Sequence, residues 1–170
     1  TLEMDNYFVD REKTPRDEDG GYDFEALETL NLPLLNEQFA ALIAGEQVIT
    51  PKFDFLTGKS LPDRPSQLKD NQIIIAEGIH GLNPELLPEI APERMLRVYV
   101  SALTQLNIDH HNRVPTTDTR LLRRIVRDAR TRGYSAQDTI ARWASVTRGE
   151  RRNIFPYQEM ADIMFNSALI

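Results

Sequence analysis

The sequence contains no cysteine, so disulfide bridges and thiolate metal ligands are excluded and a reducing compartment is compatible with the chain. No apolar run approaches the roughly 18 residues of a membrane span. The first twelve residues, TLEMDNYFVDRE, lack the basic and apolar segments of a secretion signal. At 170 residues and 41% hydrophobic, the chain is long enough for one globular domain with a hydrophobic core. We therefore expect a single cytoplasmic domain with no membrane partner.

Both ends of the chain have the character of a truncated domain. Thr1 stands where a start methionine would be, and the last ten residues, ADIMFNSALI, are apolar almost throughout. We therefore expect residues 1–170 to be a fragment or a processed chain, truncated at both ends.

Lysine is missing from the last 70 residues, where arginine is abundant. Residues 1–100 carry 9 Lys and Arg against 19 Asp and Glu, a net charge of −10, whereas residues 101–170 carry 11 Arg and 7 acids, a net charge of +4. Six of these arginines fall within the 13 positions 120–132. A cluster made of arginine alone favours planar anions such as phosphate or carboxylate, because the guanidinium group donates paired hydrogen bonds.

The arginine cluster lies in a segment with helical periodicity, TTDTRLLRRIVRDARTRG at 116–133. At 100° per residue, four arginines fall within about 100° of one another and apolar residues cover the opposite side. This arginine stripe consists of Arg120, Arg123, Arg124 and Arg127, and the apolar side of Leu121, Leu122, Ile125, Val126 and Ala129. We expect the apolar side to pack and the stripe to bind phosphate. A solvated face with salt bridges to the acidic half of the chain is the alternative, and the residues alone leave both open.

Strand and helix patterns alternate along the chain, which predicts an α/β domain with a mainly parallel sheet flanked by helices. Short apolar runs at 73–76 and 95–102 predict strands buried on both faces, and ADIMF at 161–165 predicts a last strand. Residues 46–66, in which two phenylalanines alternate between turn residues, predict a hairpin.

Helices are predicted over three further segments. DFEALETL, from Asp23, and PLLNEQFAALIA, ended by Gly45, are expected to form two short helices. Ser135 with Asp138 three residues later resembles a capping box at the start of another helix.

Two acids stand where predicted strands end. Glu77 follows the run at 73–76, and an acid at the carboxyl end of a strand can hold Mg²⁺ directly or through water. Asp5 follows a weaker strand pattern in DNYF, and a carboxylate there can accept the proton of a hydroxyl that attacks a phosphoryl group. Capping of a neighbouring loop by Glu77 and turn formation by Asp5 are the alternatives.

Two other patterns do not meet the requirements of a phosphate loop or a metal site. TGKS at 57–60 is no Walker A loop, because G-x-x-x-x-G-K-[ST] would need glycine at Phe53 and a helix where Leu61 and Pro62 stand. The three histidines, His80, His110 and His111, have no metal-ligand spacing and are expected in loops or solvent.

Taken in order, the segments MDNYF, YDFEAL, FDF, IIIAEGI and TDTRLLRRIVRD resemble the uridine kinase and phosphoribulokinase family of P-loop kinases. The resemblance is closest to the bacterial uridine-kinase-like nucleoside kinases and extends from Asp5 to about Asn166. It implies a P-loop NTPase-like fold, ATP and Mg²⁺ as cofactors, and transfer of the γ-phosphoryl group to a hydroxyl of a small metabolite, above all the 5′-hydroxyl of a nucleoside.

The same resemblance implies roles for individual residues. Asp5 would be the general base, and Glu77 would hold Mg²⁺ directly or through water. Residues 103–133 would form a lid whose arginine stripe covers the nucleotide phosphates. The acceptor pocket, which includes the 46–66 hairpin, would be lined by Phe8, Tyr22, Phe24, Glu25, Phe53 and Phe55.

The sequence departs from the family pattern in three places. The family's first strand and Walker A loop would precede Asp5 and do not occur in this sequence. Gly58 stands where uridine kinases place the histidine that contacts the pyrimidine, so the resemblance does not imply uridine specificity. The segment 101–116 is longer than usual, and Arg113 within it could add a phosphate contact. The acceptor therefore stays open among nucleosides, ribulose phosphate and other hydroxyl metabolites.

A domain of the same fold that binds anions or nucleic acid, or serves assembly, without catalysis is the alternative function. The acidic charge and the lack of aromatic residues among the arginines argue against nucleic acid as a partner. A homo-oligomer is compatible with the sequence. A Walker A motif encoded before Thr1 would favour catalysis, and its absence from the complete gene would favour the alternative.

Overall fold

The computed structural model describes residues 1–102, 109–112 and 114–168, so Arg113 and part of the predicted lid lie outside the described residues. The strands are β1 (Leu2–Glu3), β2 (Gln47–Asp54), β3 (Lys59–Gln67), β4 (Ala76–Glu77), β5 (Val98–Ser101) and β6 (Ile163–Asn166). The α-helices are α1 (Leu32–Ile43), α2 (Thr116–Thr131) and α3 (Ala136–Asn153). The 3-10 helices are η1 (Met4–Tyr7), η2 (Arg11–Lys13), η3 (Leu27–Thr29), η4 (Pro92–Arg94) and η5 (Phe155–Met160). No helix of the described part is long and apolar enough to cross a membrane.

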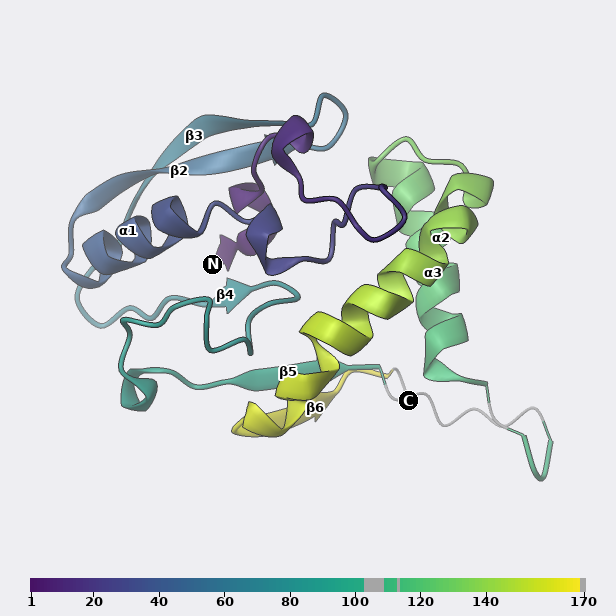
Figure 1. The fold of residues 1–170 in the computed structure, drawn as a ribbon. Coiled ribbons are helices and arrows are strands. Elements are labelled where there is room, and N and C mark those ends of the chain that lie inside the picture. Colours follow the sequence, from purple (N-terminus) through teal and green to yellow (C-terminus); the bar gives the residue numbers. More distant parts are fainter. Residues whose placement is uncertain (103–108, 113, 169–170) are drawn as a thin grey trace.

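The strands pair two by two. β1 pairs with β4 and β5 pairs with β6, both in parallel, whereas β2 and β3 form an antiparallel hairpin. In the view of Figure 1, the hairpin lies above α1, and β4 and β5 lie below it. The parallel pairs and the flanking helices confirm the predicted α/β class.

The core lies between α1 and the residues that follow β1. α1 begins after Asn31, whose side chain accepts a hydrogen bond from the N–H of Leu34 (3.3 Å), and it ends before Gly45, which has a φ of 80°. The buried core residues are Leu2, Met4, Tyr7, Leu27, Leu30, Leu35, Phe39, Leu42 and Leu86. Because Met4 and Tyr7 belong to this core, η1 is anchored and the position of Asp5 within it is fixed.

The helices α2 and α3 lie side by side at one end of the molecule, next to the loop that precedes η3 (Figure 1). The predicted capping box at the start of α3 is confirmed. The Ser135 hydroxyl accepts a hydrogen bond from the N–H of Asp138 (3.1 Å), and the Asp138 carboxylate accepts one from the N–H of Ser135 (3.0 Å).

The helix predicted from Asp23 over DFEALETL is wrong, since only η3 forms there. The Asp23 carboxylate accepts a hydrogen bond from the N–H of Glu25 (3.1 Å), a local turn that competes with helix formation. The Glu25 carbonyl accepts another from the side chain of Asn153 on α3 (2.7 Å). These contacts tie the segment to α3 in a non-helical conformation.

The prediction of strands buried on both faces is also wrong. Ile73 is 80% exposed and Ile75 is 57% exposed, and they precede β4 rather than belonging to it. Val98 and Val100 of β5 are exposed as well. Within the described residues each parallel sheet has two strands, so it offers few neighbours that could cover these side chains.

The prediction that the apolar side of the arginine helix packs is wrong in part. α2 forms over the expected residues, but Leu122 is 64% exposed and Val126 is 57% exposed, whereas Leu121 and Ile125 are half-buried. His80 lies in a turn after β4, as predicted for a loop histidine, but it is 1% exposed, and burial lowers its pKa. The hydrophobic pattern of α2 is overridden because acids on other elements attract its arginines.

Candidate functional site

Asp5 and Glu77 lie at the same edge of the β1–β4 pair. Glu3 is opposite Glu77 in the parallel register, so β1 and β4 end side by side and η1 carries Asp5 just beyond that edge. The carboxyl ends of parallel strands are the usual position of ligand sites in α/β proteins. The structure therefore brings the two predicted acids into one region.

The two carboxylates affect each other. Burial raises the pKa of Asp5, while the nearby Arg132, Arg127 and Arg124 act in the opposite direction. Burial also raises the pKa of Glu77, and the negative charges of Asp5 and Glu3 raise it further. A cation between such carboxylates would relieve their repulsion.

These carboxylates suit Mg²⁺ held largely by other oxygens. No group of three or more His, Cys, Asp or Glu side chains in the described part of the chain could hold a metal ion. Mg²⁺ in phosphoryl-transfer sites commonly takes one or two carboxylates together with substrate phosphates and water. Glu77 and Asp5 fit that donor set, with the remaining ligands supplied by phosphate.

Arg132, which the sequence did not single out, contacts Asp5. Its guanidinium donates a hydrogen bond to the Asp5 carboxylate (3.3 Å) and lies over the Phe55 ring, 4.2 Å from the ring centre. It also lies 3.9 Å from Asp128. Arg132 follows the last residue of α2, and helical projection places it outside the arginine stripe, so the pattern gave no signal for it.

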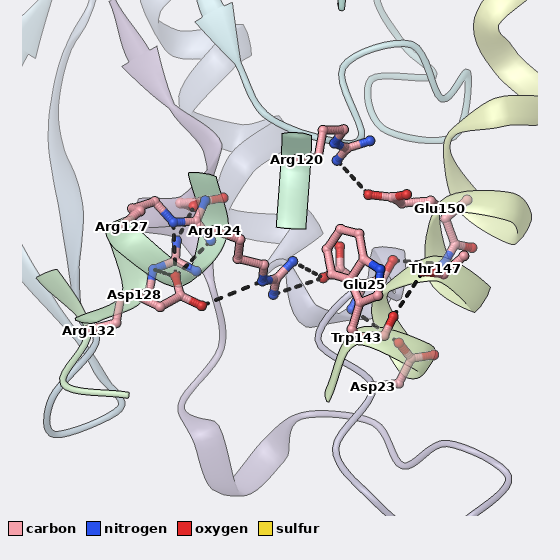
Figure 2. Close-up of polar contacts among 12 residues, drawn as sticks. Asp23, Glu25, Arg120, Arg124, Arg127, Asp128, Arg132, Trp143, Thr147 and Glu150 are labelled. Atoms are coloured by element: carbon pink, nitrogen blue, oxygen red, sulfur yellow. Dashed lines mark hydrogen bonds and ion pairs between the residues drawn. The ribbon is translucent and has the colours of Figure 1, made fainter. Parts of the chain in front are cut away.

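Three members of the arginine stripe form ion pairs with acids, as Figure 2 shows. Arg124 lies 3.3 Å from Glu25, and Arg120 pairs with Glu150 of α3 at 2.5 Å. Arg127 pairs with Asp128, its neighbour in the chain, at 2.9 Å. The fourth member, Arg123, is exposed. Two of the pairs join α2 to other elements, so Arg120 and Arg124 face the protein, whereas Arg123 and Arg127 are exposed.

Glu25 is, with Phe53, the most buried of the predicted site residues. Its residue surface is 8% exposed, and burial raises its pKa although Arg124 acts in the opposite direction. Gly149 of α3 packs directly against it, since a Cβ atom at position 149 would overlap the Cβ of Glu25. Glycine at this position thus allows α3 to approach the Glu25 backbone.

The predicted aromatic residues form two clusters. Phe8, Phe53 and Phe55 pack edge to face, with ring centres 5.2–6.3 Å apart. Tyr22 and Phe24 form a separate pair with ring centres 5.6 Å apart. Among the described contacts, Arg132 touches the first cluster, and α3 touches the second through Arg142.

The site also includes residues that the sequence did not indicate. Asp128 is buried and forms ion pairs with Arg124, Arg127 and Arg132. Glu150 is also buried and forms an ion pair with Arg120. Helical spacing from the arginines could have suggested Asp128, since it lies four residues from Arg124 and from Arg132. Glu150 is on another helix, and nothing in its local sequence signals the pair.

The sequence matches the family described as "Phosphoribulokinase / Uridine kinase family" over residues 2–169. The chain belongs to this family. Its membership confirms the resemblance drawn from the motifs. Because the family is one of kinases, phosphotransferase activity is supported at the level of the family. The α/β arrangement of parallel strands and helices is consistent with a P-loop kinase domain of this family.

Individual members of the family are similar over most of this chain. A protein named "Uridine kinase" from Deinococcus deserti is 24% identical over 164 residues, which cover 96% of this chain and 71% of that protein. A "Uridine kinase" from Chloroflexus aurantiacus is 26% identical over 165 residues, with the same coverage of both chains. A "Uridine kinase" from Staphylococcus aureus is 27% identical over 164 residues, again covering 96% and 71%.

Proposed function

We propose that the protein transfers the γ-phosphoryl group of ATP to a hydroxyl of a small metabolite, with the 5′-hydroxyl of a nucleoside as the first candidate. Family membership and the relatives named uridine kinase support the reaction class. The observation that carries the proposal is the placement of Asp5 beside Glu77, with Arg132 on its carboxylate. In-line transfer requires a base, charge neutralisation and positioning, and this region supplies groups for each.

Asp5 is proposed to accept the proton of the attacking hydroxyl. The hydroxyl oxygen forms a bond to the γ-phosphorus, the bond from that phosphorus to the bridging oxygen of ADP breaks, and the hydroxyl proton passes to Asp5. Burial raises the pKa of Asp5, which makes its carboxylate a stronger base than an exposed aspartate. The hydrogen bond from Arg132 fixes the direction of the carboxylate.

The cations of α2 and its C-terminal end are proposed to meet the nucleotide phosphates. Arg123 is exposed and accessible, while Arg120, Arg124 and Arg127 would exchange a carboxylate partner for phosphate oxygens. Mg²⁺ bound with ATP would be held by Glu77, directly or through water, and would neutralise phosphate charge. The acceptor would lie among the two aromatic clusters and Glu25.

The test is Asp5→Asn in the full-length protein. Loss of the base is expected to lower kcat by about 10²- to 10⁴-fold, with the KM for ATP kept, because asparagine retains an oxygen that Arg132 can bind. Asp70→Asn, an exposed aspartate in the turn after β3, is the matched control and should leave kcat unchanged. Near-normal turnover by Asp5→Asn would remove Asp5 as the base. Parent protein without acceptor-dependent ATP consumption would favour a non-catalytic domain.

A further inference from the structure

Arg142 lies on the face of α3 that contacts the loop before η3. Ser145, Gly149 and Asn153 of the same helix contact that loop through Asp17 and Glu25. Helical spacing places Arg142 on this face, seven residues before Gly149. Its side chain is therefore directed toward the segment that carries Phe24, one residue before Glu25.

The guanidinium of Arg142 is held by two aromatic rings. It lies 4.5 Å from the ring centre of Tyr134 and 5.5 Å from that of Phe24. Cation–π contacts of this kind orient a guanidinium while leaving its N–H donors at the ring edges free for a ligand. Arg142 is exposed, so those donors are accessible.

The charge of Arg142 has no ion-pair partner among the described residues, unlike those of Arg120, Arg124, Arg127 and Arg132. Asp138, one turn earlier on α3, feels the positive charge of Arg142, but its carboxylate accepts hydrogen bonds from Ser135 in the capping box. Arg16 is similar, because it lies 3.7 Å from the centre of the Tyr22 ring and donates to the Gly20 carbonyl. Two guanidinium groups thus contact the Tyr22–Phe24 pair, in a loop that also carries Asp17, Asp23 and Glu25.

We propose that Arg142 selects an acceptor that carries an anionic group, a carboxylate or a phosphate, at the end remote from the reacting hydroxyl. This inference rests on the proposed function, since it names the class of acceptor. Arg132 contacts Asp5, and Tyr134, two residues later and so within about 7 Å along the backbone, contacts Arg142. One small molecule would then place its hydroxyl at Asp5 and its anionic group at Arg142.

The proposed partner of Arg142 is the acceptor rather than ATP, because Arg142 and the arginine stripe lie on different helices. The arginine stripe that is proposed to meet ATP belongs to α2, whereas Arg142 belongs to α3 and contacts Phe24. Arg16 reaches the same aromatic pair from the loop side. An anionic group beside Arg142 would accept hydrogen bonds from the N–H groups of its guanidinium.

The test compares three acceptors with the full-length protein: uridine, which is neutral, orotidine, which carries a carboxylate, and ribulose 5-phosphate, which carries a phosphate. At least one anionic acceptor is expected to have a kcat/KM tenfold or more above that of uridine. Arg142→Gln should raise the KM for that acceptor by about ten- to hundred-fold, the loss of one charge-assisted hydrogen bond, with the KM for ATP unchanged. Arg142→Lys, which keeps the charge, should recover part of the affinity.

Arg151→Gln, an exposed arginine of the same helix, is the matched control and should change neither KM. Higher kcat/KM on uridine than on both anions, an acceptor KM that Arg142→Gln leaves unchanged, or an increase in the KM for ATP instead would overturn the inference. Direct calorimetric binding of orotidine and ribulose 5-phosphate separates the two proposals. Binding that depends on Arg142 without turnover keeps the inference and refutes the kinase, and no binding of either anion refutes the inference.

Discussion

Removal of either partner of the Glu25–Arg124 ion pair is expected to have unequal effects on stability. The Glu25 side chain is 10% exposed and the Arg124 side chain 23% exposed, at a separation of 3.3 Å. Arg124 also lies 3.5 Å from Asp128, whereas Glu25 has no second ion-pair partner among the described residues. Loss of the arginine therefore isolates a buried charge, and loss of the acid does not.

The magnitudes follow from this difference. Arg124→Gln leaves the Glu25 carboxylate buried without its cation and should lower the free energy of unfolding by about 3 kcal/mol. Glu25→Gln should cost about 0–1 kcal/mol, because Arg124 is partly hydrated and keeps Asp128 as a partner. The raised pKa of Glu25 points the same way, since its charged form is less favourable in the folded than in the unfolded protein even with Arg124 present.

Urea denaturation of the full-length protein at pH 7 measures the free energy of unfolding of both variants. Arg123→Gln, at an exposed position of α2, is the control, and its free energy of unfolding should stay within about 0.5 kcal/mol of the parent value. A raised folded-state pKa means that Glu25 contributes its full stability below its ordinary pKa of 4.5 and loses it as the pH rises through the folded value. The free energy of unfolding of Glu25→Gln relative to that of the parent should therefore increase as the pH rises above 4.5. Equal losses from both variants at pH 7, or a gain in the opposite pH direction, would refute this reasoning.

Two further substitutions test the packing and the start of α3. Gly149→Ala should lower the free energy of unfolding by about 1 kcal/mol and Tm by about 2–4 °C, because the overlap with Glu25 outweighs the better helix propensity of alanine; an unchanged or raised Tm would contradict the close approach. Ser135→Ala should cost about 1 kcal/mol by loss of the capping box, measured by urea denaturation, while Ser101→Ala, outside any cap, serves as the comparison.

The helices with local end signals were predictable from the sequence. Gly45 ended α1, and Ser135 with Asp138 began α3, because caps depend on residues a few positions apart. The segment from Asp23 has an equally plausible cap residue and yet forms no α-helix. Its Asp23 carboxylate bonds the Glu25 N–H, and its Glu25 carbonyl bonds Asn153, a residue more than 120 positions away. The local signal was present, and a distant partner decided the conformation.

The candidate acids were predictable for a similar reason. Asp5 and Glu77 each follow a strand pattern, and a parallel pairing brings the ends of such strands together, as the Glu3–Glu77 register shows. The burial of the strands was not predictable, because Ile73 and Ile75 can be covered only by neighbours on other elements. Periodicity reports the preference of a residue for an apolar environment, and the tertiary structure determines whether that environment exists.

The arginine stripe shows the same limit most sharply. Helical spacing found which arginines share a face but could not find the direction of that face, because the deciding residues, Glu25 and Glu150, lie on other elements. Burying Leu122 and Val126 instead would be worth about 1.5–3 kcal/mol each. A rotation of α2 that buried these two side chains would separate Arg120 and Arg124 from the buried carboxylates of Glu150 and Glu25. Each broken pair would cost about 3–5 kcal/mol. Two such pairs outweigh two apolar side chains, so Arg120 and Arg124 turn toward their acids, and Leu122 and Val126 are exposed.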